Sequence, residues 1–421
     1  MKQSRKWRRV GRALLAVGWT GWCGVSAMAQ KPAAPEPPKE KTDKDKADKD
    51  KTDAAKKPAP PAKPDPAKTT PAPPSPDDLN KQAFKLLDDK KYPEAIDLFN
   101  QVVKADRKNI QGFTGLGFAY LQLKRYPESI ASYRTAVTLN PTNAPLRGFL
   151  AGALLEADKT AESRAEYERA VDIDQSNLSY RLGIGETYNR AKNYAKAREA
   201  YLVALGYGPD SPDVHNALGN VNLQDKRYDD ALAEFTAAQR IDPENVGAKL
   251  GASSALSGLK RHSEAQSLAN QVISKFPDQT FGYTALAAAY DAADKHDEAI
   301  AAYQKSLKLT PKDAFAWGNL GWAQYNAGKY QDALTSSRKA LELDSTLAYV
   351  RLNIGLIYAV MDDWKQAEKE YKQAVALSAT SDLAGGLNDV EDALKKSNRG
   401  ALKNALTLLQ EAQRQSIGFS R

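Results

Sequence analysis

The sequence predicts an all-α fold, a right-handed superhelical solenoid of nine helix-turn-helix units with a helical cap at its C-terminal end. Two observations predict it. A 34-residue pattern repeats nine times from Pro76 to Ser381 without insertion or deletion. Within that pattern, two positions are always small and a third is aromatic in seven of the nine units. A fixed period of this length indicates stacked helix pairs, each of which buries its apolar face only against its neighbours.

The small and aromatic positions indicate how the two helices of one unit pack. With each unit numbered from 1 to 34, the units begin at Pro76, Ile110, Ala144, Leu178, Pro212, Val246, Thr280, Ala314 and Ala348. Positions 8 and 20 carry only Ala, Gly or Ser, which lets two helix backbones cross closely. Position 24 carries an aromatic residue in most units and fills the space around that crossing. Proline at position 32 of five units ends the second helix. We therefore expect two helices of roughly 12 to 14 residues in each unit.

These residues resemble the tetratricopeptide repeat family. The family pattern W-x2-L-G-x2-Y…A-x3-F…P is met nearly in full in the second unit. The matching residues there are Phe113, Leu116, Gly117, Tyr120, Tyr133 and Pro141. In the eighth unit, the opening half of the pattern is matched by Trp317, Leu320 and Gly321. The resemblance covers 306 of the 421 residues and implies a solenoid whose concave surface binds a protein or peptide partner.

The N-terminal segment 1–29 is typical of a secretory signal peptide. A start with six Lys or Arg residues precedes an apolar stretch from Ala13 to Val25. Ala27 and Ala29 form a small-x-small cleavage site before Gln30. The apolar stretch is short for a membrane span. We expect Sec-type export and cleavage, giving a periplasmic or extracellular bacterial protein with no integral membrane segment.

Two alternative export routes are weaker. Cys23 suggests a bacterial lipoprotein, but Trp22 before it is a poor neighbour for lipid attachment. Arg8 and Arg9 suggest twin-arginine export, but Gly11 stands where that signal needs an apolar residue. If the signal is retained uncut, the chain is tethered to a membrane.

Residues 30–75 and 382–421 flank the repeats. Segment 30–75 is rich in Pro, Ala, Lys and Asp and offers almost nothing to bury, so we expect a disordered linker. It serves as a solvated spacer or, alternatively, as a tail that binds the cell wall or a protein. Segment 382–421 has the pattern of two capping helices, with a break from Ser397 to Gly400. The leucines and valine that mark their apolar faces are Leu383, Leu387, Val390, Leu394, Leu402, Leu406 and Leu409.

Charge and cysteine usage exclude several classes of function. The formal charge of the whole chain is +8, but residues 76–421 contain 43 basic and 44 acidic side chains. No basic stripe remains to neutralise phosphates, so nucleic acid is not an expected partner. The one cysteine, Cys23, leaves with the signal peptide. A thiol-free mature chain suits an oxidising compartment.

Catalytic and metal-binding patterns are absent from the sequence. His262 and His296 fall at position 17, where six other units carry Tyr or Trp, and His215 falls at position 4, an aromatic slot. The three lie in different units and have no metal-ligand spacing. The sequence has no phosphate loop and no Gly-x-Ser-x-Gly elbow. We therefore expect no enzymatic activity, no metal and no cofactor.

The candidate site lies in units 7 to 9. In this family the first helix of each unit lines the concave groove, through positions 2, 5, 6, 9, 12 and 13. These positions are bland in unit 6 and largely aromatic or apolar in units 7 to 9. The predicted partner-binding residues are Phe281, Phe315, Asn319, Trp322, Tyr325, Tyr349, Leu352, Asn353 and Leu356.

Two features of these residues favour binding. Trp322 occupies a slot where packing does not demand an aromatic residue, as a binding hot spot would. Asn319 and Asn353 each offer a donor and an acceptor to a peptide backbone, as inner-wall asparagines do in the related O-GlcNAc transferase superhelix. The alternative is that Trp322 and Tyr325 pack against the next helix or the cap.

Three functions fit this sequence. The first is a non-enzymatic scaffold of the bacterial envelope that binds a partner segment and supports assembly of an envelope, secretion or pilus complex. The second is a carbohydrate-associated module of an exopolysaccharide or cell-wall system, in which Trp322 would stack on a sugar. The third is a membrane-tethered regulator, which requires an uncut signal.

Overall fold

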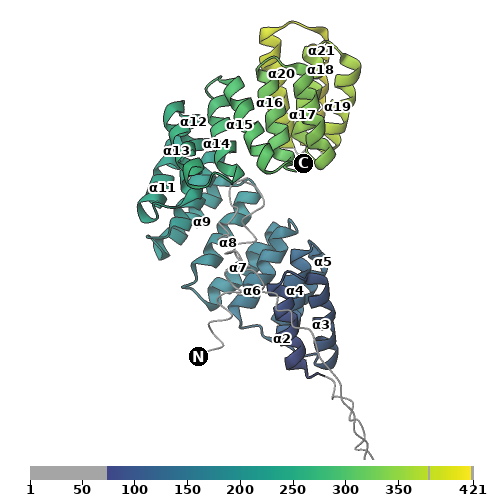
Figure 1. The fold of residues 1–421 in the computed structure, drawn as a ribbon. Helices are drawn as coiled ribbons and strands as arrows, with labels where there is room; N and C mark the ends of the chain where they lie inside the picture. The colour runs from purple at the N-terminus through teal and green to yellow at the C-terminus, as the bar shows by residue number, and fades with distance from the viewer. Residues whose placement is uncertain (1–73, 378–379, 419–421) are drawn as a thin grey trace, which may run out of the picture. The chain divides into compact units, whose positions relative to one another are not determined.

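The computed structural model describes residues 74–377 and 380–418, and the backbone there forms twenty helices and no strands. The signal peptide predicted for 1–29 and nearly all of the linker predicted for 30–75 lie outside the described residues. The described helices belong to two compact units, one with α2 to α5 and the other with α6 to α21 (Figure 1). None of these helices is both long and apolar enough to cross a bilayer.

Every repeat contributes two helices in the same register. The first helices are α2 (Pro76–Asp88), α4 (Ile110–Gln122), α6 (Ala144–Glu156), α8 (Leu178–Arg190), α10 (Pro212–Gln224), α12 (Val246–Gly258), α14 (Thr280–Asp291), α16 (Ala314–Asn326) and α18 (Ala348–Val360). The second helices are α3 (Tyr92–Ala105), α5 (Tyr126–Leu139), α7 (Thr160–Ile173), α9 (Tyr194–Tyr207), α11 (Tyr228–Ile241), α13 (His262–Lys275), α15 (His296–Leu309), α17 (Tyr330–Leu343) and α19 (Trp364–Leu377). All begin at position 1 or position 17 of a repeat, which confirms the predicted array of nine helix-turn-helix units.

The turn inside each repeat is a helix cap with one left-handed residue. Among the described residues, positive φ occurs at position 15 of each repeat, and only Gly328 of these is a glycine. In the second repeat, the amide of Arg125 donates to the carbonyl of Tyr120 at 2.9 Å, and Lys124 has a φ of 58°. This six-to-one hydrogen bond around a left-handed residue is the Schellman motif, which satisfies carbonyls at the helix end. The turn therefore has one geometry in all nine repeats, although Lys or Asp stands at the left-handed position in eight of them.

The start of most first helices is fixed by the residue at position 34. The side chains of Asn109, Asn143, Asn245 and Asp313 each accept a hydrogen bond from a backbone amide in the first turn of the following helix. In the first repeat, the Asn80 amide donates to the Oδ1 atom of Asn109 at 3.1 Å. Position 5 can therefore brace the cap that begins the next repeat.

Small residues and an aromatic ring form the core of each helix pair. The ring of Phe235, which is 1% exposed, lies against Gly219 of its own repeat and Gly251 of the next. A Cβ atom on Gly219 would lie 2.7 Å from the ring, and one on Gly251 would lie still closer. At position 20, the hydroxyl of buried Ser163 donates to the carbonyl of Ala151 at 2.8 Å, which ties the two helices at their crossing. The predicted close crossing is confirmed.

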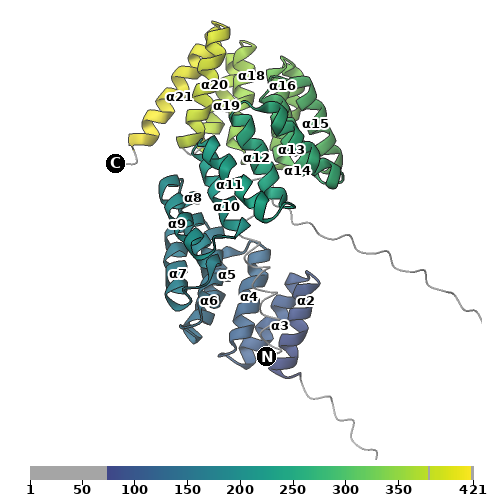
Figure 2. The same cartoon turned by 90° about the vertical axis from the view of Figure 1, so that its left-hand side faces the viewer.

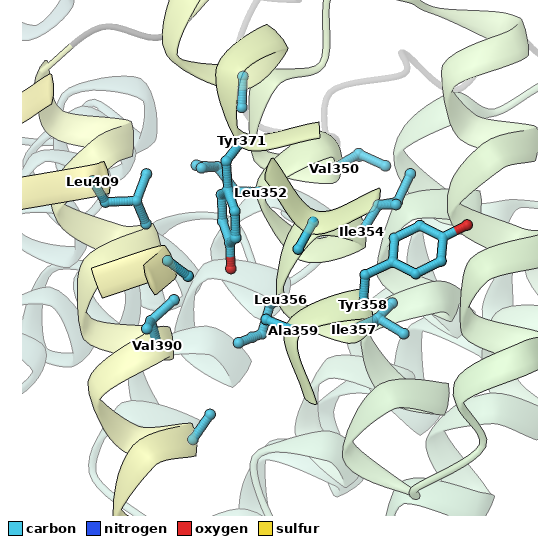
Figure 3. Packing of buried hydrophobic residues seen from close by; sticks show 14 of the residues in the cluster. Val350, Leu352, Ile354, Leu356, Ile357, Tyr358, Ala359, Tyr371, Val390 and Leu409 are labelled. Atoms are coloured by element: carbon cyan, nitrogen blue, oxygen red, sulfur yellow. The ribbon is translucent and has the colours of Figure 1, made fainter. Parts of the chain in front are cut away.

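The cap consists of α20 (Thr380–Lys396) and α21 (Gly400–Gly418), which differ in length from the repeat helices. α21 packs against α18 and α19, and α20 packs against α18 and α21 (Figure 2). The ring of Tyr371 lies between Leu352 of α18 and the cap residues Val390 and Leu409 (Figure 3). Gly386 of α20 stands close to Leu352, because a Cβ atom there would lie 3.1 Å from that side chain. The cap thus covers inner positions of the last repeat as well as its end.

Candidate partner-binding surface

Three of the predicted groove residues lie in the core. Phe281 is 8% exposed and meets Phe276 edge-on, with 6.0 Å between the ring centroids. Leu352 and Leu356 are 4% and 2% exposed, because they pack in the cluster that α20 completes. These three side chains therefore pack in the core and do not line an open groove.

Trp322 and Tyr325 support the C-terminal core. Their rings stack at 5.2 Å, and Tyr325 also meets Tyr330 at 5.9 Å. Both are half-buried and packed against the cluster that includes the cap. Burial raises the pKa of Tyr325 to about 12, with smaller effects from Tyr330 and from Asp389 of α20. This geometry agrees with the alternative interpretation, in which the two rings pack near the cap, and one face of the indole is already occupied.

Tyr349 is also held by packing. Its hydroxyl lies 2.7 Å from the place of a Cβ atom on Gly318, so glycine at that position makes room for the tyrosine. Burial raises the pKa of Tyr349 to about 12. The Tyr349 ring therefore forms a fixed wall between the inner helices of repeats 8 and 9.

Phe315, Asn319 and Asn353 remain accessible. Phe315 lies in the first turn of α16 and is 57% exposed. Asn319 follows one turn later on the same helix, and Asn353 has the same register position on α18; both are partly exposed. An exposed phenylalanine on a helix whose other aromatic residues, Trp317, Trp322 and Tyr325, pack against the core offers an apolar contact to a partner.

A polar cluster joins the C-terminal ends of α14 and α16 to the start of α15. The Oδ1 atom of Asp291 contacts His296 Nδ1 at 2.7 Å and accepts from Asn326 at 3.3 Å. Asn326 is on α16 with Phe315, and Asp291 ends α14. His296 therefore has a carboxylate partner in addition to the packing role that the sequence predicts. Among the described residues, no group of three His, Cys, Asp or Glu side chains is arranged to hold a metal ion.

The family models decide what the array is. Models described as tetratricopeptide repeat match residues 83–144 and 193–246, 121–181 and 222–290, 280–313, and 302–335. Together these matches cover more than half of the 421 residues. The chain belongs to the tetratricopeptide repeat family. The matched models describe repeats of a protein-interaction scaffold and none describes a catalytic domain.

Solved tetratricopeptide repeat structures share this fold. A tetratricopeptide repeat protein from Parabacteroides merdae is 18% identical with a TM-score of 0.52, over 59% of this chain and 98% of that one. PilW, described as a widely conserved type IV pilus biogenesis factor, is 19% identical with a TM-score of 0.43, over 48% and 94%. YrrB, described as having an unusual peptide-binding site, is 20% identical with a TM-score of 0.34, over 44% and 95%. The likeness to the Parabacteroides merdae protein shows the fold alone. The sequence has no significant match among curated proteins.

Sequence reasoning missed one charged network on the inner helices of this tetratricopeptide array. Arg190 donates to Glu156 at 2.7 Å, to Glu186 at 3.3 Å and to the carbonyl of Leu155 at 2.9 Å. The three charged side chains lie at positions 9 and 13, which the sequence predicts to face inward. Opposite charges at these positions were the signal from which the network could have been predicted. The three side chains satisfy one another's hydrogen bonds, so this part of repeats 3 and 4 offers a partner little unpaired polarity. We therefore favour the surface around Phe315, which offers apolar contact.

Proposed function

We propose that the chain is a non-enzymatic scaffold that binds an extended segment of a protein partner along the inner helices of repeats 7 to 9. The observation that carries the proposal is Phe315, which is 57% exposed on α16 while Trp317, Trp322 and Tyr325 of the same helix pack against the core. Asn319 and Asn353 supply the polar part of the surface.

The chemistry of this surface fits a peptide with an apolar side chain. Each asparagine amide donates and accepts, which matches the N–H and C=O groups of one peptide unit. Phe315 offers the apolar contact that anchors such a segment, and Trp322 and Tyr325 stack on each other further along the same helix. Repeat-array residues lack the excess positive charge that a nucleic acid would need.

The proposed location is the bacterial envelope. It rests on the signal-like segment 1–29 and on a mature sequence without cysteine. In that compartment the scaffold would support assembly of an envelope, secretion or pilus complex. Sequencing the N-terminus of the protein from its host tests this location: a start at Gln30 supports export, and an intact Met1 supports the membrane-tethered alternative.

The binding proposal is tested with Phe315→Ser and Asn353→Ala, compared with Lys339→Ser on the outward helix α17 as the matched control. Each variant is used to isolate partners from envelope extract, after circular dichroism shows unchanged helicity. We expect the first two to lose a defined protein partner that the wild type and the control retain. Equal recovery by all four proteins would contradict the assignment. Recovery of a glycan in place of a protein would favour the carbohydrate-associated alternative.

A further inference from the structure

The outward face of α9 differs from that of every other second helix. Positions 25 and 26 carry Leu202 and Val203 there, and they are 52% and 51% exposed. At position 25 the other eight repeats carry Asn100, Arg134, Glu168, Thr236, Asn270, Gln304, Arg338 and Lys372. At position 26 they carry Gln101, Thr135, Arg169, Ala237, Gln271, Lys305, Lys339 and Gln373. Because the register is fixed, these eight repeats show that the fold itself asks for no large apolar residue at either position.

The apolar face continues along one side of α9. Tyr207 is 57% exposed, and the guanidinium of Arg181 lies 3.6 Å from its ring centroid, which holds the ring in place. Gly206 is open, because a Cβ atom there would have nothing within 4 Å. The opposite side of α9 is fully used, with Ala197, Tyr201 and Ala204 buried in the core. α9 therefore has apolar residues on both sides, which is typical of a helix that is covered on both sides.

The charges around this face indicate what covers it. Val203 lies on the exposed face of α9 with Lys196 seven residues before it, and exposed Asp210 lies three residues beyond the end of α9 at Tyr207. Glu199 stands four residues before it and Tyr207 four residues after it. An antiparallel copy of α9, related by a two-fold axis through Val203, would bring Glu199 to the Tyr207 hydroxyl on both sides, and Lys196 toward the segment after α9 that carries Asp210. Such self-complementarity is the property that an isologous dimer interface requires.

We propose that two copies of this chain associate through the outward faces of their α9 helices, antiparallel and with Val203 on the two-fold axis. Gly206 has no side chain, so the second helix can approach α9 closely there. One helix of 14 residues from each copy makes a small interface, so we expect a weak dimer. The interface uses the outward surface and leaves Phe315 free to bind a partner.

Sedimentation equilibrium of the mature chain tests the proposal over a concentration series. Leu202→Arg is compared with Asn270→Arg, which adds the same charge at the same register position of repeat 6. We expect Leu202→Arg to weaken association at least about tenfold and Asn270→Arg to leave it unchanged, with equal helicity and melting temperature for both. A wild type that stays monomeric at every concentration, or a dimer that Leu202→Arg does not weaken, overturns the proposal.

A charge exchange tests the antiparallel arrangement. Lys196→Asp should weaken the dimer, and adding Asp210→Lys should restore it, because the exchanged pair meets again across the axis. Mild oxidation of Val203→Cys in the mature chain, which has no other cysteine, should give a disulfide-linked dimer, while Gln271→Cys should not. Failure of the second charge change to restore association, or equal disulfide formation by both cysteine variants, overturns the arrangement.

Discussion

Gly251 tests whether a ring held between two repeats sets the stability of the array. The ring of Phe235 lies between Gly219 and Gly251, so it has no free side toward which to move. Gly251→Ala gains about 1 kcal/mol of helix propensity. The added methyl group meets the ring well inside van der Waals distance, and overpacking of this kind costs about 1–3 kcal/mol. We expect Gly251→Ala to destabilise the protein, although alanine is the better helix former.

The sign of this effect should reverse when the ring is removed. Phe235→Ala alone should cost about 3–5 kcal/mol, because it opens a cavity at a side chain that is 1% exposed. In that variant, Gly251→Ala should be stabilising, because the methyl group then occupies part of the cavity and the helix-propensity gain remains. Urea unfolding followed by circular dichroism measures the four free energies of the cycle. Gly385→Ala is the matched control, since its Cβ has open space, and it should stabilise by about 1 kcal/mol. A stabilising Gly251→Ala in the wild type, or the same effect in both backgrounds, would refute the reasoning.

The remaining predictions concern the cap, the turns and pH. Leu409→Ala should lower the free energy of unfolding in urea by about 2–5 kcal/mol, because Leu409 is fully buried. Leu377→Ala, at a residue that is 49% exposed, should lower it by less than about 0.5 kcal/mol. Equal losses would show that α21 does not complete the core. Gly328→Ala places a Cβ at a φ of 73° and should lower stability by about 1 kcal/mol, and an unchanged unfolding midpoint would contradict the turn geometry. Burial, with a smaller effect of Asp392, raises the pKa of Asp389, so stability falls as pH rises from the unfolded pKa of about 4 through the raised folded pKa. Asp389→Asn should therefore raise the melting temperature more at pH 7 than at pH 4, and a pH-independent change would exclude that cause.

The helix pairs could be predicted because the same pattern of small and aromatic residues recurs in nine repeats. Small residues at positions 8 and 20 fix the crossing, and the hydrogen bond from Ser163 to Ala151 shows it directly. The role of position 6 could not be read in the same way. Gly251 lies at position 6 over the ring of Phe235 in the preceding repeat, and such a contact between repeats appears only when the stacking is known.

The candidate site was harder to predict because it depends on where the cap packs. The 34-residue pattern stops at Ser381, so nothing in the sequence placed α20 against the inner positions of repeat 9. That helix turns Leu352 and Leu356 into core residues. Phe315 stayed exposed, whereas Phe281 and Tyr349 at the same register position are packed, so the register position alone did not predict exposure.

Site-specific photo-crosslinking tests the central claim of a partner-binding surface on the inner helices. A benzophenone amino acid replaces Phe315 in one variant and Lys339, on the outward helix α17, in the other. Irradiation of cells that produce each variant is followed by mass spectrometry of the crosslinked products. We expect Phe315 to give one dominant protein adduct that maps to an extended segment, and Lys339 to give none. The same adducts from both positions, or none from Phe315, would contradict the account.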